Sequence, residues 1–451
     1  MKQITEDYIK SNRISVRKHF SKNNLDLYFK TKTRSVAPIS IDYLNGLILL
    51  PSRKNMKKMA VRCCKCSNNQ SLSHFLTNSP WSSSNLLKYV RNKATQIIGK
   101  KGVLILDDTG IKKYGNCSVG ASRQYLGNLG KKEICQVCVC LAYVKEDKRM
   151  LIDERLYLPE KWIADRERCL NAKIPPEEII FRTKHELGLE MIDNAISEGI
   201  PFSFVAMDGF YGGNPELLTK LENRGLTFVA DIPSNTQVYL TKPIVGIPEK
   251  KGTRGRKPTV PKVLNTMPVK VSSLTSEVEG WKFVRVRKTE RGYKEVYFKA
   301  IRVWRRQNDL PTEYPIWLLI NKDVESNEMK YSFCNATEDT SFDELAKMQS
   351  SRYWIERAFE DAKGNCGMAE YMVRNWNALH HHMALVMLAM LILLSYYTEF
   401  NKLFKVSLKA IVMILLYHNP LKNLDAWEIA SIINQDNELR MKVRISRLRS
   451  S

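Results

Sequence analysis

The first twenty residues, MKQITEDYIKSNRISVRKHF, lack the apolar segment of a secretion signal, because charged and polar side chains interrupt them throughout. The one long apolar run covers residues 383–397. It is shorter than the roughly 20 apolar residues that span a bilayer. We therefore expect this run to form a helix in a protein core, and we expect a cytoplasmic protein with no membrane partner.

Cysteine is scarce, with ten residues in a chain of 451. This number is too small for a disulfide scaffold, so we expect free thiols in a reducing compartment. Three cysteines cluster within residues 63–66, but no second pair of Cys or His follows at the spacing of zinc ligands. Three more lie in the strand-like run 134–143, where small apolar side chains are expected to pack.

Acidic residues are in the minority. The chain has 47 Asp and Glu against 71 Lys and Arg, which gives a net charge of +24. An excess of this size repels itself in a compact fold, and a polyanionic partner offsets the repulsion. Nucleic acid is the first such partner to consider, because each neutralised phosphate releases a counterion. The alternative is an ordinary basic protein whose lysines are solvated.

The chain shows no internal repeat, but its character changes along its length. We predict a helical DNA-binding region over residues 1–100, the first part of a catalytic core over 101–232 and a β-rich insertion over 233–340. The last part of the core follows over 341–419, and a basic tail covers 420–451.

The order of elements expected between residues 101 and 232 is three strands, a helix, a strand, a helix and a strand. This alternation is typical of a mixed α/β sheet. It is also the order of an RNase H-like fold, which needs one more helix, and we predict that helix over residues 342–363. The predicted fold class is α/β, an RNase H-like mixed sheet with a β-rich insertion and an N-terminal helical region.

Two of the predicted buried strands end in acids, at Asp107 and at Asp208. Active groups gather at the carboxyl ends of strands in such sheets. Either acid alone could be a helix cap or a turn former. Together with an acid from the last helix they could bind two Mg²⁺ ions, which need hard oxygen ligands and can promote phosphoryl transfer when about 4 Å apart.

The acid expected from the last helix is Glu356. At about 100° per residue, Arg352, Glu356 and Lys363 fall within roughly 40° of one another around a helix. Cations beside a carboxylate suit phosphate recognition around a metal. The alternative is an intrahelical salt bridge between Arg352 and Glu356, which are four residues apart.

These features resemble the bacterial insertion-sequence DDE transposases, which carry a Tyr-x2-Arg-x3-Glu-x6-Lys signature and a β-rich insertion before the last acid. The resemblance covers most of the chain. Arg352, Glu356 and Lys363 keep the signature spacing, whereas Gln349 stands at the position of the tyrosine. The segments that carry it are HFLTNSPW (74–81), LDDTGIKKYG (106–115), SVGASRQYLGNLGKKEICQV (118–137), AMDGFYG (206–212) and the block from RYWIERAFEDAKGNCG to HHHMALVMLAM (352–390).

The resemblance implies a metal-binding and catalytic triad of Asp107, Asp208 and Glu356, and two Mg²⁺ ions that Mn²⁺ can replace. It implies that Arg352 and Lys363 hold the phosphates of the transposon end. The partners it implies are double-stranded DNA, as terminal inverted repeats and as target, and a second copy of the chain when DNA is bound. The enzyme would act in the bacterial cytoplasm, at the nucleoid.

Further assignments concern Tyr353, the first acid, and the pair Arg254 and Arg256. Tyr353 stands where similar transposases place an aromatic ring near a flipped base, and stacking needs only a flat ring. The first acid could be Asp107 or Asp108, and the family's order of acid, one variable residue and Thr favours Asp107. Arg254 and Arg256 flank a glycine, as in hooks that enter an A·T-rich minor groove, although a plain basic loop is an equal alternative.

The predicted function is metal-dependent cleavage of transposon ends followed by attack of the freed 3′ hydroxyl on DNA, with no covalent enzyme intermediate. One alternative is a nuclease that hydrolyses DNA and never joins it. Another is an inactive or domesticated DNA-binding derivative, against which the three intact acids argue.

Overall fold

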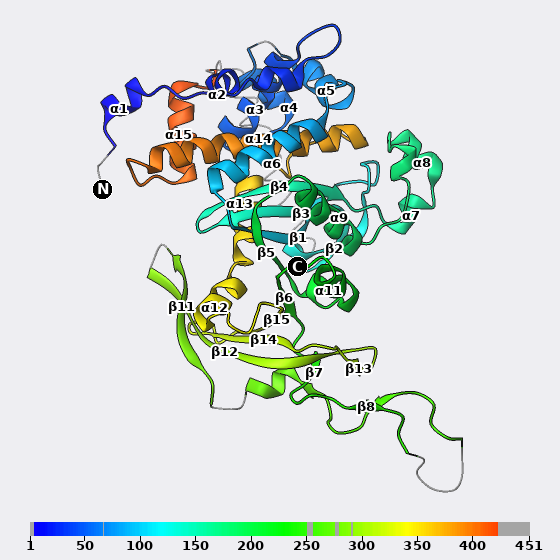
Figure 1. Cartoon of the computed structure of the whole chain (residues 1–451). Coiled ribbons are helices and arrows are strands. Elements are labelled where there is room, and N and C mark those ends of the chain that lie inside the picture. Colours follow the sequence, from blue (N-terminus) through cyan, green and yellow to red (C-terminus); the bar gives the residue numbers. More distant parts are fainter. Residues whose placement is uncertain (1–3, 66, 250–255, 276–278, 290–291, 423–451) are drawn as a thin grey trace, which may run out of the picture. The chain divides into compact units, whose positions relative to one another are not determined.

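The computed structural model describes residues 4–65, 67–249, 256–275, 279–289 and 292–422 of the chain. The chain forms two compact units (Figure 1). Unit 1 contains residues 1–86 and 363–451, and unit 2 contains residues 87–362. The basic tail predicted for residues 420–451 lies outside the described residues from position 423 onward.

Helices make up the regular structure described for unit 1. At its centre lies α14, whose side chains from Met383 to Leu394 are all buried. The predicted core helix is therefore confirmed: α14 is long and apolar enough to cross a membrane, but most of it is buried inside the protein. The helices are α1 (Glu6–Ser11), α2 (Val16–Lys22), the 3-10 helix η1 (Leu25–Phe29), α3 (Ala37–Leu49), α4 (Met56–Arg62), α5 (Asn69–Thr77), α14 (Trp376–Asn401) and α15 (Leu408–His418), while α6 (Ser83–Ile98) continues into unit 2.

Unit 2 is built on a large mixed sheet, which Figure 1 shows in cyan and green. Its N-terminal strands are β1 (Gly102–Lys112), β2 (Ser122–Leu126), β3 (Lys131–Lys145), β4 (Lys148–Leu156), β5 (Phe202–Met207) and β6 (Phe228–Ile232). Strand β1 pairs antiparallel with β3, and β3 pairs antiparallel with β4. On its other side β1 pairs parallel with β5, which pairs parallel with β6. An antiparallel meander followed by two parallel strands is the RNase H-like topology that the sequence predicts.

The connections of this core are helical, as crossovers between parallel strands require. Helix α9 begins with a capping box in which Thr183 and Glu186 bond each other's backbone N–H groups. The helices and turns between β4 and β6 are α7 (Glu160–Ile163), α8 (Arg166–Asn171), the 3-10 helix η3 (Pro176–Glu178), α9 (Lys184–Ser197), α10 (Gly209–Gly212) and α11 (Pro215–Glu222).

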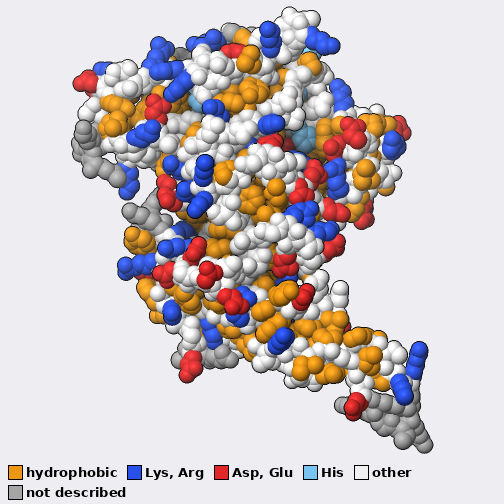
Figure 2. Space-filling model, viewed as in Figure 1, with side chains coloured by type: hydrophobic (Ala, Val, Ile, Leu, Met, Phe, Trp, Pro, Cys, Tyr) orange, Lys and Arg blue, Asp and Glu red, His pale blue; other side chains and the backbone are white. Residues whose placement is uncertain are grey.

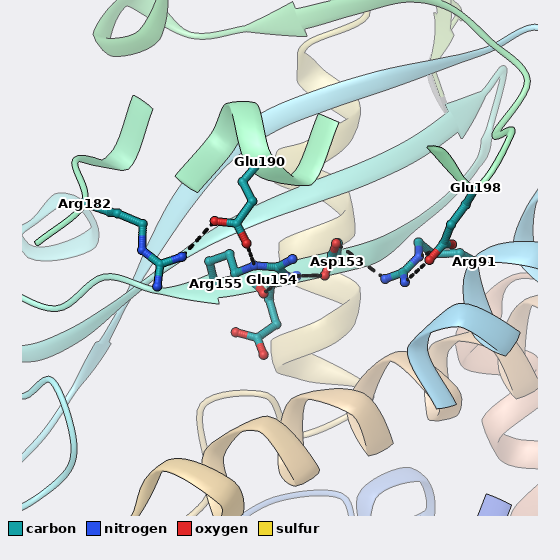
Figure 3. Close-up of polar contacts among 7 residues, drawn as sticks. All are labelled: Arg91, Asp153, Glu154, Arg155, Arg182, Glu190 and Glu198. Atoms are coloured by element: carbon teal, nitrogen blue, oxygen red, sulfur yellow. Dashed lines mark hydrogen bonds and ion pairs between the residues drawn. The ribbon is translucent and has the colours of Figure 1, made fainter. Parts of the chain in front are cut away.

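A network of ion pairs crosses one face of β4 (Figure 3). Asp153, which is buried, contacts Arg155 at 2.8 Å and Arg91 at 3.4 Å. Arg91 also bonds Glu198, and Arg155 bonds Glu190. Each carboxylate in this chain of contacts has a guanidinium directly beside it. The network therefore links α6 and the end of α9 to the sheet, and we name it the β4 network.

Most strands of the predicted insertion belong to the same sheet as the core, while β8 and β9 form a separate two-stranded sheet. Strand β15 pairs antiparallel with β6, so the insertion strands extend the core sheet beyond its edge. Sequence periodicity finds strands but not their pairing partners, so the sequence did not reveal this continuity. The strands are β7 (Gln237–Tyr239), β8 (Val245–Gly246), β9 (Lys262–Val263), β10 (Val269–Lys270), β11 (Lys282–Thr289), β12 (Gly292–Gln307), β13 (Leu310–Pro311), β14 (Ile316–Asp323) and β15 (Met329–Cys334), with the 3-10 helix η4 (Val271–Thr275) between β10 and β11.

The arm around β8 and β9 carries several exposed apolar side chains, which appear in orange at the lower right of Figure 2. Lys and Arg side chains are scattered over the face seen in Figure 2 and do not gather into one patch. The excess of positive charge is therefore distributed over this face rather than concentrated on one element.

The helix predicted over residues 342–363 is divided in two. Helix α12 (Phe342–Ser350) packs its buried residues Leu345, Ala346 and Met348 into the core of the insertion sheet. Helix α13 (Tyr353–Gly364) then begins after a turn at Ser351 and Arg352. The division leaves Arg352 in the turn before α13.

Candidate active site

Asp107 and Asp208 directly follow the parallel pairing of β1 with β5. The last parallel pair of β1 and β5 is Leu106 with Met207, so both acids are the next residue along their strands. The sequence prediction was wrong in one detail, because β1 does not end at the acids. It continues to Lys112 in antiparallel pairing with β3.

Asp208 is held at the start of α10. One of its carboxylate oxygens accepts hydrogen bonds from the backbone N–H groups of Phe210 and Tyr211, at 3.1 and 3.2 Å. The last residue of α10, Gly212, lies directly against β6, where any side chain would overlap the carbonyl oxygen of Asp231. Glycine at this position therefore lets α10 pack closely enough to hold Asp208 beside the sheet. Asp208 is thus also the helix cap that the alternative interpretation expected.

The electrostatics of the two acids are strongly perturbed. Burial, with the carboxylates of Asp208 and Asp108 nearby, raises the pKa of Asp107 to about 8. Burial also raises the pKa of Asp208; the negative charge of Asp108 adds to the increase, and the backbone bond from Tyr211 opposes it. Two carboxyl groups that disfavour each other's charge are typical of sites that bind a cation.

Tyr211 places a hydroxyl beside these acids. Its side chain is fully buried, and the hydroxyl has no hydrogen-bond partner among the described residues. Burial raises the pKa of this hydroxyl well above its ordinary value, and the charges of Asp108, Asp107 and Asp208 raise it further. A buried hydroxyl without a partner costs about 1–3 kcal/mol. Such a group is expected where a site takes up a ligand or ordered water.

Asp108 is engaged differently from Asp107. Its carboxylate contacts the ammonium group of Lys184, the first residue of α9, at 2.9 Å. Its backbone N–H donates to the carboxylate of Asp107 at 2.7 Å. Asp107 instead lies near Arg352, at 4.0 Å. The neighbouring acids thus face different cations, and Asp107 is the one that shares a cation with Glu356.

Arg352 contacts carboxylates from three elements. Its Nη2 atom donates to Oε1 of Glu356 at 2.7 Å, and its Nε atom lies 3.0 Å from Oδ2 of Asp231 on β6. Its Nη1 atom lies 4.0 Å from Oδ2 of Asp107. The structure therefore brings Asp107 and Asp208 together directly, and joins Glu356 to them through Arg352. The salt bridge between Arg352 and Glu356 considered from the sequence is present, although Arg352 precedes the helix, and it is one of several contacts of Arg352.

Asp231 was missed by the sequence analysis, and the available signal was an acid inside the apolar strand FVADI. Ser332 on β15 donates to Asp231 at 2.6 Å, and Gln349 donates to the Ser332 hydroxyl at 2.9 Å. Gln349, at the signature's tyrosine position, is buried and also accepts from the amide of Asn321. Its side chain thus supports Arg352 through Ser332 and Asp231 and does not face solvent.

The described residues include no group of three or more His, Cys, Asp or Glu side chains already arranged to hold a metal ion. Arg352, a permanent cation, lies among the acids instead. The residues nevertheless fit divalent cations. Asp107 and Asp208 supply hard oxygen ligands whose negative charges are crowded, and the Tyr211 hydroxyl beside them has a free hydrogen-bonding capacity.

The remaining predicted site residues are spread over three places. Tyr353 is the first residue of α13, next to Arg352, and Lys363 lies in the last turn of that helix. Arg256 is exposed in the segment between β8 and β9, and Arg254 lies outside the described residues.

A protein-family model described as DDE superfamily endonuclease matches residues 26–293. A probable transposase for insertion sequence element IS701, from Microchaete diplosiphon, is 29% identical over 197 residues. That match covers 43% of this chain and 48% of the relative, so the chain spans about half the length of the curated relative it matches. Among solved structures, the cryo-EM structure of the piggyBac transposase synaptic complex with hairpin DNA matches with a TM-score of 0.40 and 12% identity, over 95% of this chain and 83% of that one. Because the family model matches more than half of its residues, this chain belongs to the DDE superfamily endonucleases.

Proposed function

We propose that this protein is an insertion-sequence transposase that cuts DNA at transposon ends and joins the freed 3′ hydroxyl to DNA. The observation that carries the proposal is the pair of crowded acids, Asp107 and Asp208, which directly follow the parallel pairing of β1 with β5 beside the Arg352–Glu356 pair. Membership of the DDE superfamily endonucleases supports it, as does the similarity to a probable transposase for an insertion sequence element.

Asp107, Asp208 and Glu356 would hold two Mg²⁺ ions, which Mn²⁺ can replace. When bound, these ions supply the positive charge that activates the attacking oxygen and stabilises the leaving oxygen. The family match ends at residue 293, so the role of Glu356 depends on other evidence. That evidence is its spacing from Arg352 and Lys363 and its link to Asp107 through Arg352.

The cationic residues of α13 and of the turn before it would position the DNA. Arg352 already lies among oxygen anions, and a guanidinium in this place can pair with a phosphate once metal ions neutralise the carboxylates. Lys363 would contribute a second phosphate contact from the end of α13. Tyr353 would stack against an unpaired base. The partner is double-stranded DNA, and the working form is a homodimer that holds two ends.

The remaining proposals concern domains and location. The helical residues up to about 100 and the segment containing Arg254 and Arg256 would contact DNA outside the catalytic core. The core would comprise residues 101–232 and 341–419, with 233–340 as the insertion and 420–451 as a basic tail. The protein would act in the bacterial cytoplasm, at the nucleoid.

The test is an in vitro reaction of the full chain with a duplex that carries the repeat flanking its coding region, in the presence of Mg²⁺. We expect cleavage at the repeat and a product in which the cleaved end is joined to DNA. Cleavage without any joined product would favour the nuclease alternative. Specific binding with no cleavage in either Mg²⁺ or Mn²⁺ would favour an inactive DNA-binding derivative.

The role of Glu356 is tested by Glu356→Gln, which removes a charge and keeps the shape. We expect end binding to survive and cleavage to fall below detection. The matched control is Glu360→Gln, because Glu360 lies on the same helix, is similarly exposed and pairs with Arg357. If Glu356→Gln cleaves as well as Glu360→Gln, the role of Glu356 is only that of a salt-bridge partner of Arg352.

A further inference from the structure

Strand β11 contains a β-bulge that changes the direction of one arginine. The register between β11 and β12 shifts between Arg285 and Arg287, and Arg287 is paired with Lys294. Val284 is paired with Val296. Lys294 and Val296 are two residues apart, so they share one face of β12, and their partners share that face too. Without the bulge, Arg287 would face the opposite side from Val284, three residues before it.

The face that Arg287 shares is the one covered by the helices. Val284 packs in a cluster with Leu345 of α12. Helix α13 follows α12 after the turn that contains Arg352. The guanidinium carbon of Arg287 lies 3.5 Å from the centre of the Tyr353 ring, at the start of α13. The bulge thus brings an arginine of the insertion next to the residue that follows Arg352.

Arg287 differs from other arginines of the insertion in its partners. Arg285 pairs with Glu295, Arg302 with Glu338, and Arg305 with Glu222. Within the described part of the chain, no carboxylate lies within ion-pair distance of Arg287, and its contact is the aromatic ring. Both Arg287 and Tyr353 are partly exposed. A positive charge that an acid does not neutralise, stacked on an accessible ring, is suited to a nucleotide.

We propose that Arg287 is a DNA-binding residue of the active site and that its guanidinium covers the Tyr353 ring in the free protein. When DNA binds, an unpaired base takes the place of the guanidinium on the ring, and the guanidinium pairs with a phosphate of the same strand. This inference rests on the proposed function, since it assumes that DNA reaches the catalytic helix.

The experiment compares the full-length wild type with Arg287→Ala, Arg287→Lys and Arg285→Ala. Arg285→Ala is the matched control, because it removes the same charge from the same strand on the opposite face. The probe is a terminal-repeat duplex with 2-aminopurine placed in turn at each nucleotide near the cut. Binding is measured at several salt concentrations, without divalent metal, and fluorescence reports the unstacked base.

For Arg287→Ala we expect about tenfold weaker binding and a salt slope smaller by about 0.9, the value for one lost phosphate contact. The fluorescence of the unstacked base should also change relative to the wild type. Arg287→Lys should keep the salt slope, because the ammonium group still pairs with the phosphate. It should alter the fluorescence, because an ammonium group lacks the two-pronged phosphate contact of a guanidinium and positions the strand differently over the ring. Arg285→Ala should leave the fluorescence as in the wild type.

Arg287→Ala with the same salt slope and fluorescence as the wild type would overturn the inference, as would equal effects of Arg285→Ala. These measurements need no cleavage. If the wild type binds the repeat but never cuts it, the proposed function fails and the test of Arg287 still stands. Melting temperatures of all four proteins identify any variant that fails to fold. If Arg287→Ala fails to fold, the fluorescence measured with Arg287→Lys, compared with that of the wild type, decides whether the inference stands.

Discussion

Two groups of charged side chains in unit 2 have opposite organisation. In the β4 network, carboxylates and guanidiniums alternate, so Asp153 has Arg91 and Arg155 directly beside it. In the candidate active site a single guanidinium, that of Arg352, contacts acids from β1, β6 and α13. Asp208 is bonded there by backbone N–H groups instead.

The difference separates a structural ion-pair network from a cation-binding site. Removing one partner from a buried, satisfied pair leaves an uncompensated charge and destabilises the fold. Removing one acid from a group of crowded carboxylates reduces their mutual repulsion but takes away a metal ligand. The β4 network should therefore be needed for stability, and the acids around Arg352 for activity.

The largest expected effect is on cleavage. Asp107→Asn and Asp208→Asn should each reduce the cleavage rate by on the order of 10³-fold, because each removes a negatively charged metal ligand. The rates are measured on a terminal-repeat duplex with Mg²⁺. Asp108→Asn is the control that decides which neighbour is the ligand. If Asp108→Asn abolishes cleavage and Asp107→Asn does not, the assignment of the two acids is reversed.

The next effect is on stability. Asp153→Asn should lower the free energy of unfolding by about 2–3 kcal/mol, because Arg91 and Arg155 lose the buried acid that they share while Glu198 and Glu190 still pair with them. Asp107→Asn makes the same chemical change in another buried strand, but should leave the melting temperature without Mg²⁺ unchanged or higher. Denaturant titration of both proteins measures the difference. Similar destabilisation of the two variants would contradict the view that the β4 network stabilises the fold and the acids around Arg352 do not.

A smaller effect is expected at Gln349, which supports Arg352 through Ser332 and Asp231. Gln349→Leu should reduce cleavage by about 10- to 100-fold, the range found when groups behind metal ligands are removed. The control is Met348→Ala, a change at the neighbouring core residue that costs stability by another route. If the two variants lose activity in proportion to their loss of stability, Gln349 has only a structural role.

The smallest effect is the response of the fold to Mg²⁺. Mg²⁺ at 100 times its dissociation constant should stabilise the wild type by about 2.7 kcal/mol, since only the folded protein binds it. The double variant Asp107→Asn, Asp208→Asn should lose this stabilisation, which a thermal-shift titration measures. Asp153→Asn should melt earlier but retain the full Mg²⁺ response. A response that persists in the double variant would place the ion elsewhere.

The sequence alone determined the order of the core strands, the buried helix and the acids Asp107 and Asp208 beside the parallel strands. Continuous apolar runs such as residues 103–106 and 383–397 indicate burial on all sides, and an acid directly after such a run is visible without coordinates. The spacing of Arg352, Glu356 and Lys363 is likewise a local property of one short segment, the turn before α13 and α13 itself. These features are local along the chain, so short-range patterns reveal them.

Only the tertiary structure decided which distant residues meet. Pairing of β15 with β6 made the insertion part of the core sheet and brought Ser332 to Asp231. A one-residue bulge in β11 brought Arg287 to Tyr353. Register and bulges depend on long-range strand pairing, and a shift of one residue reverses the face of every side chain that follows. The contacts of Arg352 and Tyr353 with distant residues therefore cannot be predicted from any local segment of the sequence.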